Sequence, residues 1–312
     1  MKIKKLLHKI KNIEALLNII SLIVIVLIQE KTEEPLRTIF IIEWCVVIIL
    51  ITWRDYNLKM ELEKEEEKNK RDEYAKKVLS KITQLQDIKA NYFREKTYDY
   101  VITENNQPYY YNPHQYLYDI CQSLRYTMAD ILKTHCDYVD VSFIYKYAEK
   151  DETWKWLVGK SSMSDAIDLN KFVNDRDSFY NYIINNPEEM PVIINDKSNP
   201  GKIKYKCHRR DRMFNNKGSV YGIPITFFNN KRKLVESILI ISTYGINFVD
   251  VKASEYEINE FKKNLSYEIL PYYISLMQVE LGALFLRHNK NDIIFNSQVK
   301  TIDYYSFLKC TY

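Results

Sequence analysis

The chain has 312 residues and a formal net charge of +4, because 45 Lys and Arg residues stand against 41 Asp and Glu residues. A charge so nearly balanced excludes a dedicated nucleic-acid binder, whose domain is more strongly basic. The cysteines number 5, are scattered along the chain and form no CxxC pair. This usage is typical of a protein in a reducing compartment.

Two apolar stretches, Leu16–Ile28 and Ile39–Trp53, lie close together near the N-terminus. A bilayer core requires about 20 apolar residues, with a lower limit near 17. With flanking residues included, segments 13–28 and 38–53 supply 16 each. We predict a two-helix transmembrane hairpin over residues 13–53, inserted in the lipid bilayer. The alternative is a helical hairpin buried in a globular core.

The basic residues around the hairpin predict its orientation. Five lysines fall in the N-terminal residues 1–12, whereas the connecting loop carries only Lys31 and Arg37. Positive charge favours the cytoplasmic side, so we expect both termini in the cytoplasm. The scarcity of glycine beside abundant Ile, Lys, Asn and Tyr indicates an AT-rich bacterial genome. The expected location is the inner or plasma membrane of a bacterium.

Two polar residues within the spans are candidates for membrane function. Glu43 lies in the second span, where an ionised side chain costs several kcal/mol unless it is paired, protonated or facing water. It is interpreted either as a pore-lining or oligomer-contact residue, or as a Glu at the interface of a tilted helix. Asn18 in the first span can hydrogen-bond across helices, which makes a homo-oligomer the expected state.

Residues 54–95 are rich in charge and predict a helical linker. Its apolar positions are too interrupted for a sustained coiled coil, which needs several unbroken heptads. The linker is interpreted either as a signalling stalk or as a spacer that holds the following domain off the bilayer.

The remaining chain shows helical and strand periodicities in turn. An amphipathic helix is predicted after the Pro- and Asn-rich segment 105–113, and its apolar face consists of Leu117, Ile120, Leu124, Met128, Ile131 and His135. The alternation over 139–145 and 154–158 predicts an antiparallel hairpin. We then expect a helix over 169–185, a strand over 191–196 and a basic loop over 197–217.

Two more strands are predicted over 219–228 and 235–243, followed by a long closing helix. That helix begins at Ser254, where Ser254 and Glu257 have the spacing of a capping box. Pro271 is expected to kink it, because proline removes a backbone donor and crowds the preceding turn.

The order of these elements, and the segment Lys217–Ile225, resemble the GAF domain, a ligand-sensing module. In that segment KGSVYGIPI is similar to the family's strand of Gly-Ser, apolar residues and Pro. The resemblance covers residues 115–288 and implies an α+β fold with an antiparallel sheet flanked by helices. We assign residues 96–288 to this GAF-like sensor domain and 289–312 to a C-terminal tail. The signature of the cyclic-nucleotide-binding members is absent, so that ligand is not carried over.

The basic loop holds the candidate ligand-binding residues. Arg209, Arg210 and Arg212 could pair with phosphate or carboxylate oxygens, which predicts a small anionic ligand such as a nucleotide. Asp196 before the loop and Tyr221 after it complete the predicted site. The alternative is a solvated loop whose arginines pair with nearby acids or with phospholipid headgroups.

Sequence motifs for catalysis and metal binding are missing. The chain contains no GxSxG, GxxxxGK[ST], GxGxxG or HExxH motif, so we expect no enzymatic activity. His135-Cys136 and Cys207-His208 offer zinc-ligand types without the usual spacing, and we expect neither a metal nor a cofactor.

These observations predict a membrane-anchored sensor or effector. A cytoplasmic domain would bind a small ligand and change the association of the membrane helices, an architecture similar to that of bacterial defence effectors. The alternative is a non-catalytic membrane scaffold that recruits a protein partner through the same domain.

Overall fold

The computed structural model describes residues 34–103, 112–148, 151–159, 168–230 and 232–289. The chain divides into two units, Met1–Glu73 and Tyr74–Tyr312. One helix, α2 (Glu34–Thr103), contributes residues to both units. The predicted first span lies outside the described residues, as does Asn18. The second predicted span is helical within α2, and its insertion in a membrane stays a prediction.

The second unit is an α+β domain, which confirms the predicted fold class. Its five strands form one antiparallel sheet in the order β2-β1-β5-β4-β3. Their bounds are as follows: β1 Val139–Tyr147, β2 Asp151–Val158, β3 Val192–Ile194, β4 Val220–Asn229 and β5 Arg232–Thr243. The predicted hairpin of β1 and β2 is confirmed, as is the antiparallel pairing of β4 with β5.

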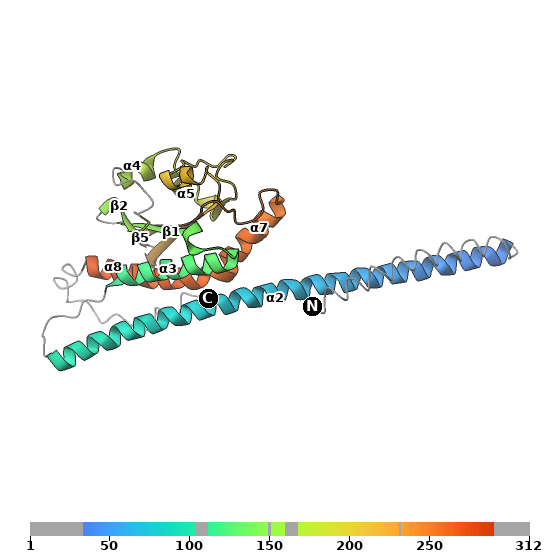
Figure 1. Cartoon of the computed structure of the whole chain (residues 1–312), viewed down its shortest axis with the longest axis horizontal. Helices are drawn as coiled ribbons and strands as arrows, with labels where there is room; N and C mark the ends of the chain where they lie inside the picture. The colour runs from blue at the N-terminus through green and yellow to red at the C-terminus, as the bar shows by residue number, and fades with distance from the viewer. Residues whose placement is uncertain (1–33, 104–111, 149–150, 160–167, 231, 290–312) are drawn as a thin grey trace. The chain divides into compact units, whose positions relative to one another are not determined.

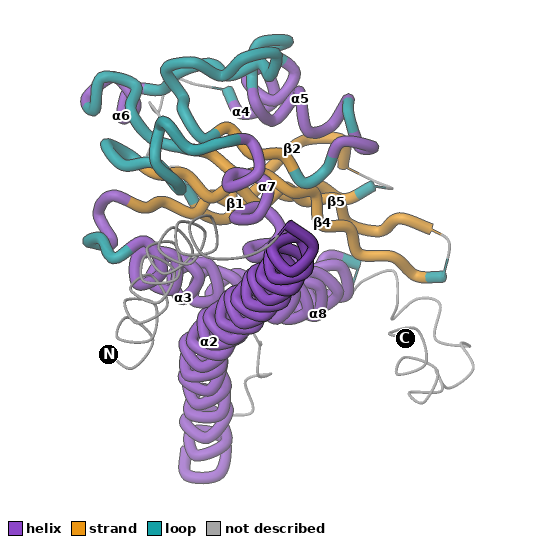
Figure 2. The backbone as a smooth tube through the Cα atoms, turned by 90° about the vertical axis from the view of Figure 1, so that its right-hand side faces the viewer, coloured by secondary structure: helices purple, strands orange, loops and turns teal. Residues whose placement is uncertain are grey.

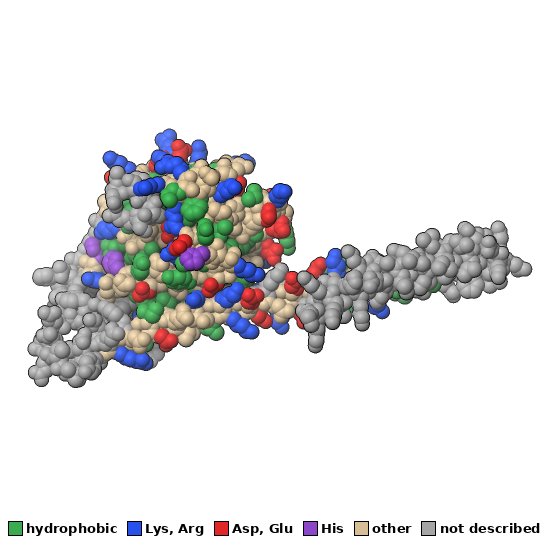
Figure 3. Space-filling model, in the orientation of Figure 1, with side chains coloured by type: hydrophobic (Ala, Val, Ile, Leu, Met, Phe, Trp, Pro, Cys, Tyr) green, Lys and Arg blue, Asp and Glu red, His purple; other side chains and the backbone are tan. Residues whose placement is uncertain are grey.

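Helices cover both faces of the sheet. Figures 1 and 2 show α3 and α8 on one face and α4 and α5 on the other. The helices have these bounds: α3 Pro113–Leu132, α4 Leu169–Asn174, α5 Phe179–Asn185, α6 Arg209–Met213, α7 Glu255–Asn264 and α8 Leu270–His288, with short turns η1 Cys136–Tyr138, η3 Pro187–Glu189 and η4 Leu265–Ile269. On the surface of the domain that Figure 3 presents, acidic and basic side chains are interspersed.

Each face of the sheet supports its own apolar core. Phe143 and Leu239 are paired across β1 and β5 and face the larger core, with α3 and α8. Ile144 and Ile238 are the next pair and face the smaller core, with α4 and α5. This alternation follows from the period of two residues in a strand, which sends successive side chains to opposite faces.

The C-terminal part of α2 packs into the larger core. Val78 and Leu85 are 1% exposed, and the Tyr116 hydroxyl of α3 donates to the Leu85 carbonyl at 3.2 Å. Lys89 of α2 forms an ion pair of 2.7 Å with the buried Glu280 of α8. Residues 74–95, which the sequence placed in a linker, therefore contribute to the fold of the domain.

Three local expectations were wrong. The helix predicted over 169–185 is two helices, because Asp175 ends α4 and the Ser178 side chain caps α5. The predicted loop 197–217 contains the helix α6. His135 does not extend the apolar face of α3, since Lys133 adopts a left-handed conformation that ends the helix, and the His135 side chain is exposed.

The closing helix begins as predicted, and Ser254 and Glu257 form both hydrogen bonds of the capping box. Directly before Pro271 the helix widens into the π turn η4. A π turn accommodates the missing N–H of proline and its crowding of the preceding turn. In the part of the chain that the structure describes, Glu255–His288 is the one helical stretch with the length and hydropathy to cross a membrane. However, 44% of its most apolar 18-residue segment is buried in the domain.

Candidate ligand pocket

A pocket lies on the sheet face that α4 and α5 cover. The cavity itself measures about 30 Å³, and about 440 Å³ when the open space at its mouth is counted. The lining residues come from four strands, from α5, from the segment before β4 and from the residue that follows β5: Asp140, Ser142, Trp156, Phe179, Tyr180, Tyr205, His208, Val220, Ile240, Ser242 and Tyr244. Aromatic rings and a few convergent polar groups are the usual lining of a small-molecule site.

Strand alternation places the polar lining residues. In β1, Val139, Val141 and Phe143 face the larger core, so Asp140 and Ser142 between them point to the pocket side. Ser142 Oγ and the Tyr180 hydroxyl lie 3.0 Å apart and link β1 to α5. A strand that is apolar on one face and polar on the other thus builds part of the pocket wall.

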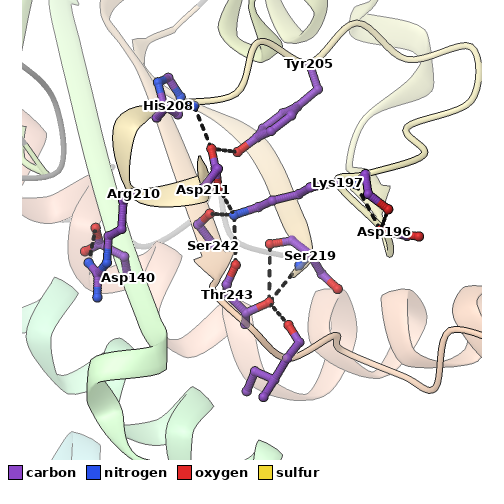
Figure 4. A network of polar contacts seen from close by, with 12 residues as sticks. Asp140, Asp196, Lys197, Tyr205, His208, Arg210, Asp211, Ser219, Ser242 and Thr243 are labelled. Carbon is purple, nitrogen blue, oxygen red and sulfur yellow. Dashed lines mark hydrogen bonds and ion pairs between the residues drawn. The ribbon is translucent and has the colours of Figure 1, made fainter. Parts of the chain in front are cut away.

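A buried ion pair anchors the long segment between β3 and β4 over the sheet (Figure 4). Lys197 Nζ donates to Asp211 Oδ1 at 2.8 Å, to Ser242 Oγ at 2.6 Å and to the Thr243 carbonyl at 2.8 Å. Its ammonium also lies 4.2 Å from the ring centroid of Tyr244. All three N–H groups of Lys197 therefore have acceptors, which a buried ammonium requires.

Asp211 is equally well satisfied. Its Oδ2 accepts from the Tyr205 hydroxyl and from the backbone N–H of His208, each at 2.8 Å. Burial by itself would raise the pKa of Asp211, but Lys197 and these hydrogen bonds outweigh it and hold the pKa below its ordinary value. Burial lowers the pKa of Lys197, although Asp211 opposes that change. The pair thus fixes Tyr205 and His208 at the pocket wall.

A second ion pair joins α6 to the start of β1. Arg210 Nη1 lies 3.2 Å from Asp140 Oδ2, and its guanidinium is 4.2 Å from the ring centroid of Tyr244. Arg210 also donates to the carbonyl of Asp137. Burial raises the pKa of Asp140, and the nearby Arg210 only partly opposes this increase.

Burial also acts on His208, whose pKa it lowers, so the imidazole is neutral at neutral pH.

Gly218 lets the segment return to the sheet. Its φ is +136°, and a Cβ there would lie 2.1 Å from the carbonyl oxygen of Thr243. The Gly218 carbonyl accepts from the backbone N–H of Lys197 at 2.8 Å. A side chain at this position would therefore push the segment away from the acceptor that Lys197 uses.

The structure does not bring all the predicted ligand-binding residues together. Arg209 and Arg212 are exposed and do not line the pocket, and Arg210 is held by Asp140. Asp196 accepts hydrogen bonds from Ser198 in its own turn.

Tyr221 lies on the opposite face of the sheet. It is fully buried in the larger core, with its hydroxyl 2.9 Å from Ser266 Oγ. The side chain of Glu43 is not among those described.

Sequence reasoning missed the residues that matter most to the geometry, Lys197, Tyr205 and Asp211. A weak signal was present, since Asp211 stands three residues after His208, the spacing at which its carboxylate accepts from the His208 backbone N–H at the start of α6. The sequence alone gave no sign that Lys197, next to the charged Asp196, is buried.

One cluster of metal-ligand types occurs among the described residues. The donor atoms of His135, Cys136 and Asp137 lie within 4.8 Å of one another, at the turn η1. Arg125 lies 3.5 Å from Asp137 Oδ1 and competes with a cation for that carboxylate. Cys207 and His208, the other predicted candidates, are not part of this cluster.

The chain matches none of the known protein-family models, and no curated protein matches its sequence. The geometry of the pocket is therefore the basis of the functional argument.

Proposed function

We propose that the chain is a membrane-anchored sensor whose domain binds a small ligand in the pocket and thereby alters the association of its membrane helices. The observation that carries this proposal is the pocket itself, an aromatic and polar surface held over the sheet by two ion pairs. The order of elements, with two strands, helices, a strand, a long segment, two strands and a closing helix, supports our proposal that the domain is GAF-like.

The described part of the first unit supports a membrane anchor. Ile42, Val46, Ile49, Leu50 and Trp53 are all at least half exposed on α2. Neighbouring exposed apolar side chains on one helix favour an apolar environment, and we propose that lipid is this environment. Retention of the chain in vesicles after a carbonate wash tests this anchor, and release into the supernatant would contradict it.

Helix α2 connects the domain with the predicted second span. It contains the predicted second span and also the core residues Val78 and Leu85 of the domain. The ion pair of Lys89 with Glu280 ties it to α8. A change in the packing of α8 would therefore reach α2 through contacts that are already in place.

The outward side of α8 supports self-association. Tyr272, Val279 and Leu286 recur at every seventh position and are each more than half exposed, with Leu276 and Ala283 between them. This is the spacing of a two-helix seam, and the inward side of α8 is already buried against the sheet. We propose that α8 of a second copy covers this stripe, because one stripe repeated on two copies is self-complementary across a two-fold axis.

A thermal-shift screen of metabolites on the full chain in maltoside micelles tests ligand binding. We expect at least one compound to raise the melting temperature, and Tyr180→Phe to reduce that shift, because its hydroxyl lies in the pocket wall beside Ser142. Tyr118→Phe, at an exposed tyrosine of α3, is the matched control. If no compound produces a shift, the ligand-sensing function is refuted and the scaffold alternative is favoured.

A further inference from the structure

The segment 197–217 between β3 and β4 leaves an excess of positive charge on the outside of the domain. It contains eight Lys and Arg residues and a single acidic residue, Asp211. Four of these cations have an acidic partner within the fold. The pairs are Lys197 with Asp211, Lys204 with Asp177, Lys206 with Asp175 and Arg210 with Asp140. Half of the positive charge of the segment is therefore neutralised by the domain itself.

The other four cations have no such partner. Within the described residues, none of them forms an ion pair, and all are exposed: Lys202, Arg209, Arg212 and Lys217. Neighbouring charges of one sign add up to a surface potential that attracts the opposite charge. The unpaired cations of this segment are therefore free to meet an anionic partner outside the domain.

Two of these cations share one side of α6, which Figure 2 shows at the edge of the domain. Because successive residues of a helix are turned by about 100°, Arg209, Arg212 and Met213 point to one side. Arg210 and Asp211 point to the other side, into their ion pairs with the rest of the domain. We call the outward side, formed by Arg209, Arg212 and Met213, the α6 face.

Met213 gives the α6 face an apolar tip. The residue is 71% exposed, although methionine is among the residues that are most often buried. An apolar side chain among cations suits the surface of a bilayer, where the apolar group enters the headgroup boundary and the cations meet lipid phosphates. Arginine is well adapted to this position, because its guanidinium binds two phosphate oxygens and its stem is apolar.

We propose that the α6 face docks on the anionic lipid headgroups of the membrane in which the chain is anchored. This inference goes beyond the proposed sensor function and rests only on its anchor, since α2 contains both the predicted span and core residues of the domain. A tethered face meets the lipid at high effective concentration, so a few cations are sufficient to hold it. Nucleic acid offers similar phosphates, but the nearly balanced charge of the chain disfavours that partner.

Oxidation of Met213 by hydrogen peroxide measures this contact. The full chain is reconstituted in vesicles of phosphatidylcholine, alone or with about 30% phosphatidylglycerol, and the sulfoxide is measured by peptide mass spectrometry. We expect Met213 to be oxidised about threefold or more slowly in the anionic vesicles, because docking covers its sulfur. Salt at about 0.5 M should abolish this protection by screening the charges. Met190, which is half-buried and outside the α6 face, should be oxidised equally in both.

Two double variants locate the attraction. Arg209→Gln with Arg212→Gln should reduce the protection to about 1.5-fold or less, because each cation near an anionic leaflet strengthens association about fivefold. Arg232→Gln with Lys233→Gln removes the same charge at the start of β5, whereas the segment 197–217 contacts the end of that strand. This control should leave the protection unchanged. All four residues are exposed, so neither variant disturbs the core.

Equal oxidation of Met213 in the two kinds of vesicle would overturn the docking proposal, as would full protection in the arginine variant. Protection by an RNA oligonucleotide, and not by phosphatidylglycerol, would assign the α6 face to nucleic acid and also overturn it. The carbonate wash tests the anchor separately. If the wash releases the chain, flotation of the released chain with anionic vesicles, lost in the arginine variant, would support the docking surface although the anchor fails.

Discussion

The buried pair of Lys197 and Asp211 provides the sharpest test of the structure. Replacing Lys197 by Met keeps the length of the side chain and removes three hydrogen bonds, one of them to a carboxylate. Asp211 is then a buried charge that retains only Tyr205 and the His208 N–H. Loss of one partner from a buried pair costs about 3–5 kcal/mol, a large part of the stability of an ordinary domain.

The assay is urea unfolding of the full chain in maltoside micelles, followed by tryptophan fluorescence. Lys202→Met is the matched control in the same segment, since Lys202 is exposed, and its effect should stay within about 0.5 kcal/mol. The double variant with Asp211→Asn should lose less than the sum of the two single variants, because no unpaired buried charge remains. A loss below about 1 kcal/mol for Lys197→Met, or strict additivity in the double variant, would refute the anchoring role of the pair.

Three further outcomes are expected. Burial lowers the pKa of His208 in the folded state below its ordinary 6.5. The neutral imidazole therefore contributes to stability above pH 6.5, and this contribution is lost as the pH falls from 6.5 toward the folded-state pKa. When the pH is lowered from about 7.5 to about 5.5, the urea midpoint of His208→Gln should fall less than that of the wild-type protein. Gly222→Ala would place a Cβ 2.4 Å from Ile183 Cδ1 and 2.7 Å from Phe179 Cε1, and should lower the free energy of unfolding by about 1–3 kcal/mol. Val279→Glu should weaken self-association in analytical ultracentrifugation, because it puts a charge in the exposed seam of α8.

Each of these has its own contradicting result. His114 also has a lowered pKa, and it is present in both the wild-type protein and the His208→Gln variant. If the urea midpoint depends on pH equally in the two proteins, the pH dependence does not come from His208. Wild-type stability for Gly222→Ala would mean that α5 does not pack closely on β4. Gln278→Glu, at an exposed position of α8 about 100° around the helix from Val279, is the control for Val279→Glu, and an equal effect of both would argue against the seam.

Local sequence patterns determined much of the fold. The alternation over 139–145 and 154–158 predicted the β1–β2 hairpin, and the spacing of Ser254 and Glu257 predicted the start of α7. These features depend on residues close together in the chain, because strand alternation and helix capping each involve residues only a few positions apart. The α+β class followed from the same patterns.

The tertiary structure alone decided which charges are buried and which face the pocket. The acceptors of Lys197 lie 14, 45 and 46 residues away in the chain, so no local pattern marks this lysine as a core residue. Asp140 likewise acquires its cation from Arg210, 70 residues away. The sequence determined that basic residues precede β4, but only the packing of that segment on the sheet turned them away from the pocket, because burial and pairing depend on neighbours that are distant in the chain.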